Sequence, residues 1–220
     1  MPELGRFSFS APDYVRDSTG PFEFDEKVRM YSLDGRLYAE GDPAFYVYQL
    51  VSGVVICFKS LAVGRRSIDA FRFAGDIFGF DGDEKRQFSA VAISNVSVRV
   101  ARRDAVFLRA AVDRDAGQEL LAATYRELQR AQRRALLLAM NARQRIATFL
   151  LEMSERLGRP DNFELPMTRQ DIADYLGLTI ETVSRTFTQF DRACVIASRT
   201  SGYVALLNSP ALRLMVDACK

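Results

Sequence analysis

The sequence predicts an α+β protein made of an N-terminal antiparallel β-roll, a long helix and a C-terminal winged helix-turn-helix. Regular turns separate short β-favouring runs in the first half of the chain, and an apolar stripe at helical spacing follows. Two short helical patterns joined by a glycine then precede a hairpin pattern. We expect an arm over residues 1–21, the β-roll over 22–115, the long helix over 116–140 and the winged domain over 141–220.

The β-roll is predicted from turn dipeptides that recur between residues 22 and 100. Asp34-Gly35, Ser52-Gly53 and Gly75-Asp76 are three of them, and the run over residues 54–58 is one of the β-favouring segments between turns. Evenly spaced turns between short strands are typical of antiparallel rolls, barrels and sandwiches. The first 21 residues are less patterned, so we expect them to form a loosely held arm.

The long helix carries one apolar stripe, and its other faces are rich in arginine and glutamate. The stripe consists of Leu121, Tyr125, Leu128, Ala131, Ala135 and Leu138. Such a narrow seam suits a partner helix, so we expect these residues to form a homodimer interface. Packing of the stripe against the chain's own β-roll is the alternative. A second helix is expected over about residues 142–157.

Residues 168–185 have the pattern of two helices joined by a tight turn. Thr168 can cap the first helix, with Asp171 as the acidic member of a capping box. Gly177 stands where the chain must leave that helix, a position that favours a residue free to adopt positive φ. Thr179 can start the second helix. This layout is typical of a helix-turn-helix that reads DNA.

The second helix of this pair has the chemistry for reading bases on one face. Ile180, Val183 and Phe187 follow at helical spacing and are expected to be buried, which leaves Glu181 and Arg185 outside. An arginine can donate two hydrogen bonds to guanine, and a carboxylate can accept one from cytosine. A surface ion pair between residues four apart is the alternative. The surrounding turn pattern favours DNA reading.

A predicted β-hairpin follows the second helix. Residues 195–198 and 203–206 flank a turn that contains Ser201-Gly202, and a hairpin in this place is a wing. Arg199, Thr200 and Ser201 at its tip could touch phosphates. Arg199 could equally be an ordinary solvated loop residue.

Composition excludes several classes of protein. Hydrophobic residues make up 48% and charged residues 26%, as in ordinary globular proteins, and no apolar run is long enough to span a membrane. The N-terminus lacks a signal-like profile, so we expect a cytoplasmic protein without a membrane partner. The net charge is only +2, which argues against binding polyanions by bulk charge.

The chain contains no histidine, which removes histidine bases, histidine–zinc sites and histidine-ligated haem. No phosphate-cradling glycine loop and no Gly-x-Ser-x-Gly elbow is present either, so we expect no enzymatic activity. Cys57, Cys194 and Cys219 are widely spaced and odd in number, which argues against a disulfide framework and against a four-thiolate metal site. We therefore expect free thiols and no cofactor.

The order of β-roll, long helix and winged helix-turn-helix resembles the cyclic-AMP receptor protein/FNR family of bacterial transcription regulators. In the first half the resemblance rests on Gly41-Asp42, on Tyr48 with Gly53 and Val55, and on the Gly-Asp-Ile-Phe-Gly motif of residues 75–79. It makes that half similar to a cyclic-nucleotide-binding domain. In the second half it rests on residues 168–185.

The second half is similar to the FNR branch, whose Glu-x-x-Ser-Arg helix implies a TTGAT-type half-site. By that resemblance Glu181, Ser184 and Arg185 carry the base contacts. The residues expected to contact or support the DNA backbone are Thr168, Arg169, Thr179, Thr182 and Arg199. A homodimer would read a palindrome of the type TTGAT-N4-ATCAA, with its recognition helices ~34 Å apart.

Departures from the family pattern separate its branches. Phe80 stands where cyclic-AMP receptors carry a glutamate for the ribose, and Gln87 and Phe88 leave Ser89 without the preceding arginine that would hold the cyclic phosphate. Arg86 could act as a shifted substitute for that arginine. The N-terminal cysteine cluster of FNR itself is missing, because no cysteine precedes Cys57.

With these two patterns missing, the chain resembles the FixK-like branch of the family. The resemblance implies an activator of genes for microaerobic or anaerobic respiration and nitrogen fixation, acting through contact with RNA polymerase and without cyclic AMP or an iron–sulfur cluster. One alternative is a β-roll that holds a small effector in an aromatic pocket, although such residues are more often core. The aromatic residues concerned are Phe71, Phe73, Phe78, Phe80 and Phe88. Another is redox control through Cys194, where oxidation would add polarity or negative charge close to the DNA backbone.

Overall fold

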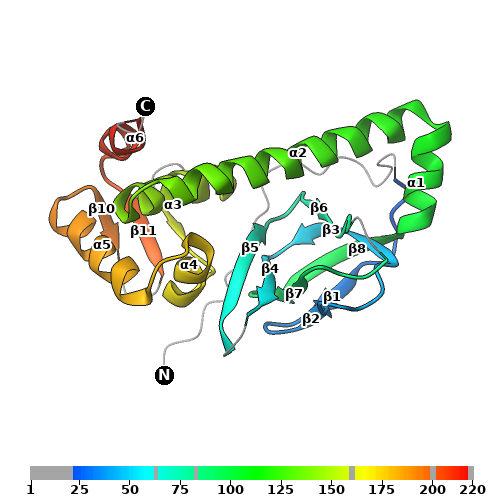
Figure 1. The fold of residues 1–220 in the computed structure, drawn as a ribbon, viewed down its shortest axis with the longest axis horizontal. Coiled ribbons are helices and arrows are strands. Elements are labelled where there is room, and N and C mark those ends of the chain that lie inside the picture. Colours follow the sequence, from blue (N-terminus) through cyan, green and yellow to red (C-terminus); the bar gives the residue numbers. More distant parts are fainter. Residues whose placement is uncertain (1–21, 62–63, 82–83, 159–161, 199–201, 218–220) are drawn as a thin grey trace, which may run out of the picture. The chain divides into compact units, whose positions relative to one another are not determined.

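A computed structural model describes residues 22–61, 64–81, 84–158, 162–198 and 202–217. The expected arm over residues 1–21, the wing tip Arg199-Thr200-Ser201 and Cys219 lie outside these ranges. The chain divides into two compact units (Figure 1). The N-terminal unit consists of the chain up to Ile56 together with Phe71–Gln118, and the C-terminal unit consists of Cys57–Ala70 together with the chain from Glu119 onward.

The N-terminal half contains two four-stranded sheets. One sheet has the order β1 (Arg29–Tyr31), β8 (Val96–Arg102), β3 (Tyr46–Ser52), β6 (Ile77–Phe78). The other has the order β2 (Arg36–Tyr38), β7 (Ser89–Ala92), β4 (Val55–Ser60), β5 (Arg66–Arg72). Strand β8 pairs antiparallel with β1 and β3, and β2 pairs antiparallel with β7. The α+β class with an N-terminal antiparallel β-roll is therefore confirmed.

The core of the N-terminal unit follows from the alternation of side chains along paired strands. Tyr48 faces Val100 and Leu50 faces Val98 across β3 and β8, and all four are buried. Gly53 ends this strand pair with φ +86°, and a Cβ there would lie 2.2 Å from the Asn95 carbonyl oxygen. Only glycine fits this close approach of two backbones.

An aromatic cluster fills the centre of this core. The rings of Tyr38 and Phe78 lie 5.4 and 5.5 Å from that of Tyr48, between centroids. Phe71 and Phe73 are also buried. These side chains bury large apolar areas and contribute to the stability of the unit. Phe80 and Phe88, the other two aromatic residues considered for an effector pocket, are half-buried.

Helices dominate the rest of the chain. In chain order they are α1 (Arg103–Val112), α2 (Arg114–Ala139), α3 (Ala142–Arg156), α4 (Arg169–Leu176), α5 (Ile180–Arg192) and α6 (Ser209–Asp217). A three-stranded antiparallel sheet has the order β10 (Ile196–Ser198), β11 (Tyr203–Leu206), β9 (Asn162–Glu164). The helix near 142–157 and the hairpin were predicted, whereas β9 and α6 were not.

Large apolar side chains from the helices form the core of the C-terminal unit. Phe149 and Leu150 of α3, Ile172 of α4 and Phe190 of α5 are each no more than 1% exposed. The helix-turn-helix thus rests on α3, which supplies a rigid base for the two short helices. Within the described ranges, no helix is both long and apolar enough to cross a membrane.

Candidate nucleic-acid interface

The first helix of the pair, α4, is capped by Thr168. The Thr168 hydroxyl accepts from the Asp171 backbone N–H at 3.1 Å, and the Asp171 carboxylate accepts from the Thr168 N–H at 2.8 Å. The helix ends at Gly177 with φ +63°, and the Leu178 N–H donates to the Ala173 carbonyl at 3.0 Å. The predicted capping box and left-handed turn are both present, so α4 and α5 are held at a defined angle.

The second helix, α5, begins at the cap Thr179, whose hydroxyl accepts from the Thr182 N–H at 3.2 Å. Val183 and Phe187 are buried, as expected. Ile180 is 38% exposed, so its predicted burial is wrong. It lies in the first turn at the margin of the packed face, and Thr186 contributes to the core instead.

The outer face of α5 presents polar side chains to solvent. Glu181, Ser184 and Arg185 are exposed, and so are Thr188 and Gln189 one turn further along. The pKa of Glu181 is lowered, first by a hydrogen bond from its own backbone N–H and then by the Thr179 hydroxyl, so it remains an ionised acceptor. No ion pair between described residues joins Glu181 to Arg185, and both are therefore available to a ligand. Helical spacing from Ser184 and Arg185 could have identified Thr188 and Gln189.

Arg169 lies beside this face in an unusual environment. Its guanidinium stacks on the Phe187 ring at 3.3 Å from the centroid, and desolvation lowers its pKa to about 10. Its Nη1 is buried without a hydrogen-bond partner in the described chain. Arg169, Phe187 and Ser184 line a pocket of about 520 Å³ that also includes Ser198 and Gly202 from the wing. An anionic group in this pocket would satisfy the guanidinium.

The β10–β11 hairpin is joined directly to α5. Ile196 pairs with Leu206 and Ser198 with Val204, and the Asp191 carboxylate of α5 accepts from the Ser198 N–H at 3.0 Å. The unpredicted strand β9 adds a third strand on the other side of β11. Cys194 lies in the turn between α5 and β10, where it is exposed and has φ +53°.

Arg145 is a residue that the sequence analysis did not single out. Its guanidinium donates to the carbonyls of Leu138 and Met140 at the end of α2, at 2.7 and 2.9 Å. It also donates to the carbonyl of Leu176 at the end of α4, at 2.9 Å. Unpaired carbonyls at helix ends attract cations, so one arginine joins the long helix to the helix-turn-helix. No local signal marks this role.

Known proteins are similar to the C-terminal domain and to most of the chain. The Crp-like helix-turn-helix domain matches residues 144–215. The nitrogen fixation regulation protein FixK of Azorhizobium caulinodans is 40% identical over 190 residues, which is 84% of this chain and 77% of that protein. The chain belongs to the CRP/FNR family of bacterial transcription regulators, in its FixK-like branch.

Two further members of the family support this assignment. The transcriptional activatory protein AadR of Rhodopseudomonas palustris is 40% identical over 190 residues, 80% of this chain and 78% of that protein. The structure of FixK2 from Bradyrhizobium japonicum, 39% identical, superposes with a TM-score of 0.82 over 86% of this chain and 96% of that one. Transcription regulation is not an enzymatic activity, in agreement with the sequence prediction.

The predicted stripe on α2 is exposed in this CRP/FNR family member. Leu121, Tyr125 and Leu128 are between 53% and 71% exposed, Leu138 is 50% exposed, and Ala131 and Ala135 are also exposed. The side chains that α2 buries are Ala116, Ala123 and Leu137, on the opposite face. Leu136, which is 66% exposed, extends the stripe and was missed by the sequence analysis.

Arg86, the alternative phosphate ligand, is committed to internal contacts in this regulator. It is 3% exposed, and its Nη1 donates to the Asp81 carboxylate at 2.7 Å and to the Gly79 carbonyl at 2.8 Å. Its guanidinium also lies 4.2 Å from the centroid of the Tyr38 ring. Asp81 already balances its charge, so a phosphate would have to displace a buried ion pair.

Proposed function

We propose that the protein is a homodimeric, sequence-specific regulator that reads a TTGAT-N4-ATCAA-type palindrome. The observation that carries this proposal is the outer face of α5, where Glu181, Ser184 and Arg185 are exposed on a capped and buried helix. Arg185 would donate to guanine and Glu181 would accept from cytosine in the major groove. The backbone contacts proposed are those of Thr168, Arg169, Thr179, Thr182 and, outside the described residues, Arg199.

The exposed stripe of α2 supports the dimer. Large apolar side chains in one row on a helix are typical of an interface between helices. Two-fold symmetry would place the recognition helices ~34 Å apart, in successive major grooves. A palindrome follows from the same symmetry.

The regulated genes are proposed from the named relatives. FixK is named for nitrogen fixation and AadR for activation. We assign this chain the activation of microaerobic, anaerobic or nitrogen fixation genes, through contact with RNA polymerase. The internal ion pair of Arg86 and the buried aromatic cluster support activity without a cyclic nucleotide, and the ligand-binding alternative predicts an effector requirement.

Fluorescence anisotropy at fixed salt tests the proposal. The purified, reduced protein is denatured, refolded in plain buffer and titrated onto a TTGAT-N4-ATCAA duplex and onto a scrambled duplex. We expect tight, selective binding with two chains per palindromic duplex. Weak or unselective binding would show that an effector is needed or that the DNA sequence is different.

Sedimentation tests the dimer separately. Leu128→Glu puts a charge in the centre of the stripe, and Arg133→Gln changes an exposed residue outside it. We expect the first variant to sediment as a monomer and the second as a dimer. A Leu128→Glu variant that stays dimeric would place the interface elsewhere.

A further inference from the structure

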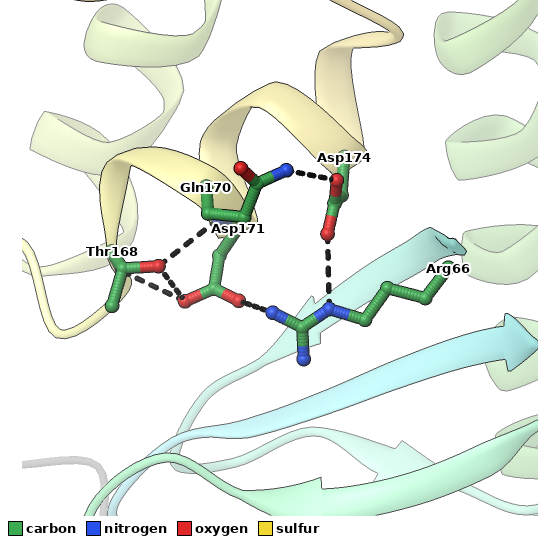
Figure 2. A network of polar contacts seen from close by, with 5 residues as sticks. All are labelled: Arg66, Thr168, Gln170, Asp171 and Asp174. Carbon is green, nitrogen blue, oxygen red and sulfur yellow. Dashed lines mark hydrogen bonds and ion pairs between the residues drawn. The ribbon is translucent and has the colours of Figure 1, made fainter. Parts of the chain in front are cut away.

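The strongest unassigned feature is an arginine from the β4–β5 hairpin that binds the first helix of the helix-turn-helix. Arg66 lies at the start of β5, in the part of the hairpin that belongs to the C-terminal unit. Its Nε donates to the Asp174 carboxylate at 3.0 Å, and its Nη2 donates to the Asp171 carboxylate (Figure 2). The side chains of Asp171 and Asp174 are only 6% and 15% exposed.

Both carboxylates have a second task within α4. The other oxygen of Asp171 accepts from the N–H and the hydroxyl of Thr168, at 2.8 and 2.7 Å, and so forms the cap of the helix. The other oxygen of Asp174 accepts from the Gln170 side-chain amide at 2.7 Å. Figure 2 shows Arg66 beneath this network, with both acids turned toward it. Without Arg66, two poorly solvated carboxylates would lie close together with no cation bound to them.

A second arginine holds the same hairpin. Arg134 of α2 donates to the Asp69 carbonyl at 2.8 Å and to the Ser67 hydroxyl at 3.4 Å. Its guanidinium also lies 5.3 Å from the centroid of the Tyr175 ring of α4. The hairpin, the long helix and α4 therefore meet in one cluster of polar contacts. Arg66 supplies its two contacts to α4 from a position far outside the matched domain of residues 144–215.

We propose that Arg66 is a positioning residue for DNA binding, which sets the orientation of α4 and, through the Gly177 turn, that of the recognition helix α5. This inference rests on the proposed function. The contact spans 105 and 108 positions of sequence and uses two donors in a fixed fork, so it restrains both the position and the rotation of α4.

The test compares Arg66→Gln with Arg65→Gln, a neighbouring arginine that is exposed. Arg66→Gln removes both charge-assisted hydrogen bonds to α4, so we expect it to weaken binding of the palindromic duplex at least about tenfold, and Arg65→Gln to leave binding unchanged. The slope of log affinity against log salt should stay the same, because Arg66 acts through α4. A slope reduced by about one would show instead that Arg66 contacts a phosphate, and would overturn the proposal.

A double-mutant cycle shows whether the effect passes through α4. We expect Asp174→Asn to weaken selective binding in the wild-type background and to add little in the Arg66→Gln background. Additive losses would contradict the proposed route. Thermal unfolding of each variant shows that the chain is folded under the conditions of the assay.

Hydrogen exchange separates this inference from the proposed function. If wild-type protein does not discriminate the palindrome, the proposed DNA sequence fails, but exchange of the α4 amides still reports on Arg66. We expect these amides to exchange faster in Arg66→Gln than in Arg65→Gln, while those of α6 stay unchanged. Equal exchange in the two variants would overturn the positioning role.

Discussion

The guanidinium of Arg169 lies 3.3 Å from the centre of the Phe187 ring, so the first turn of α4 is stacked on the middle of the recognition helix. This contact covers an aromatic side chain of the core and leaves Nη1 buried without a partner within the described chain. The contact packs against the core and places an unpartnered donor beside the outer face of α5. If that face reads DNA as proposed, Arg169 contributes both to the stability of the motif and to its affinity for DNA.

Replacement of Arg169 by glutamine is expected to weaken binding to the palindromic and scrambled duplexes by similar factors. The proposed phosphate contact carries no sequence information, and its loss should lower the salt slope by about one. Desolvation lowers the Arg169 pKa only to about 10, so the charge persists at neutral pH. Anisotropy titrations at several salt concentrations measure both effects. A change confined to the palindrome would assign Arg169 to base reading.

Arg185→Ala is expected to weaken binding to the palindromic duplex much more than binding to the scrambled duplex. Loss of a bidentate contact to guanine should cost ~1–3 kcal/mol for the palindrome and relax selectivity at one base pair. Binding to duplexes with single substitutions in each half-site locates that pair. Arg192→Ala, at the exposed end of the same helix, is the matched control. Equal weakening of all duplexes by Arg185→Ala would exclude direct readout.

Gly177→Ala is expected to lower the free energy of unfolding by about 1 kcal/mol, because a left-handed backbone is costly for residues with a Cβ. The nearest heavy atom to such a Cβ would be Leu138 Cδ2 at 3.6 Å, so space is available and the cost is conformational. Gly177→Asn should lose less, since asparagine tolerates this conformation better. Urea denaturation measures the difference. Equal losses would indicate a steric cause.

Glu152→Gln is expected to stabilise the protein at pH 7.5. Burial raises the pKa of Glu152, although Arg156 and Arg133 partly oppose this effect. A raised folded-state pKa means that ionisation of Glu152 destabilises the folded protein relative to the unfolded chain. The free energy of unfolding therefore falls as the pH rises from the unfolded-state pKa through the folded-state pKa. Glu152→Gln should therefore have a higher Tm than the wild type at pH 7.5, and this difference in Tm should shrink toward pH 4. A gap independent of pH would point to packing instead of charge.

Cys194 provides a test of redox control. The thiol is exposed in the turn before β10, so we expect peroxide to weaken DNA binding of the wild type and to have little effect on Cys194→Ser. Cys57 is buried and is expected to react slowly. Full resistance of the wild type to peroxide would end this hypothesis.

The sequence by itself determined the features whose signals lie within a few residues. The Thr168–Asp171 cap, the Gly177 turn and the polar outer face of α5 each depend on spacings of three or four positions, and the structure contains all of them. The apolar stripe of α2 was also predicted. Leu136 was missed because intervals of three and four residues from Ala131 lead to Ala135 and Leu138 and pass over it.

Only the tertiary structure decided the contacts between distant segments. The pairing of Phe163 with Val204, the three carbonyls bound by Arg145 and the binding of Asp171 by Arg66 join residues that share no local pattern. An arginine on a hairpin looks like a solvated side chain until the fold places buried carboxylates beside it. The physical reason is that local propensity depends on near neighbours, whereas the partner of a buried charge depends on how the whole chain packs.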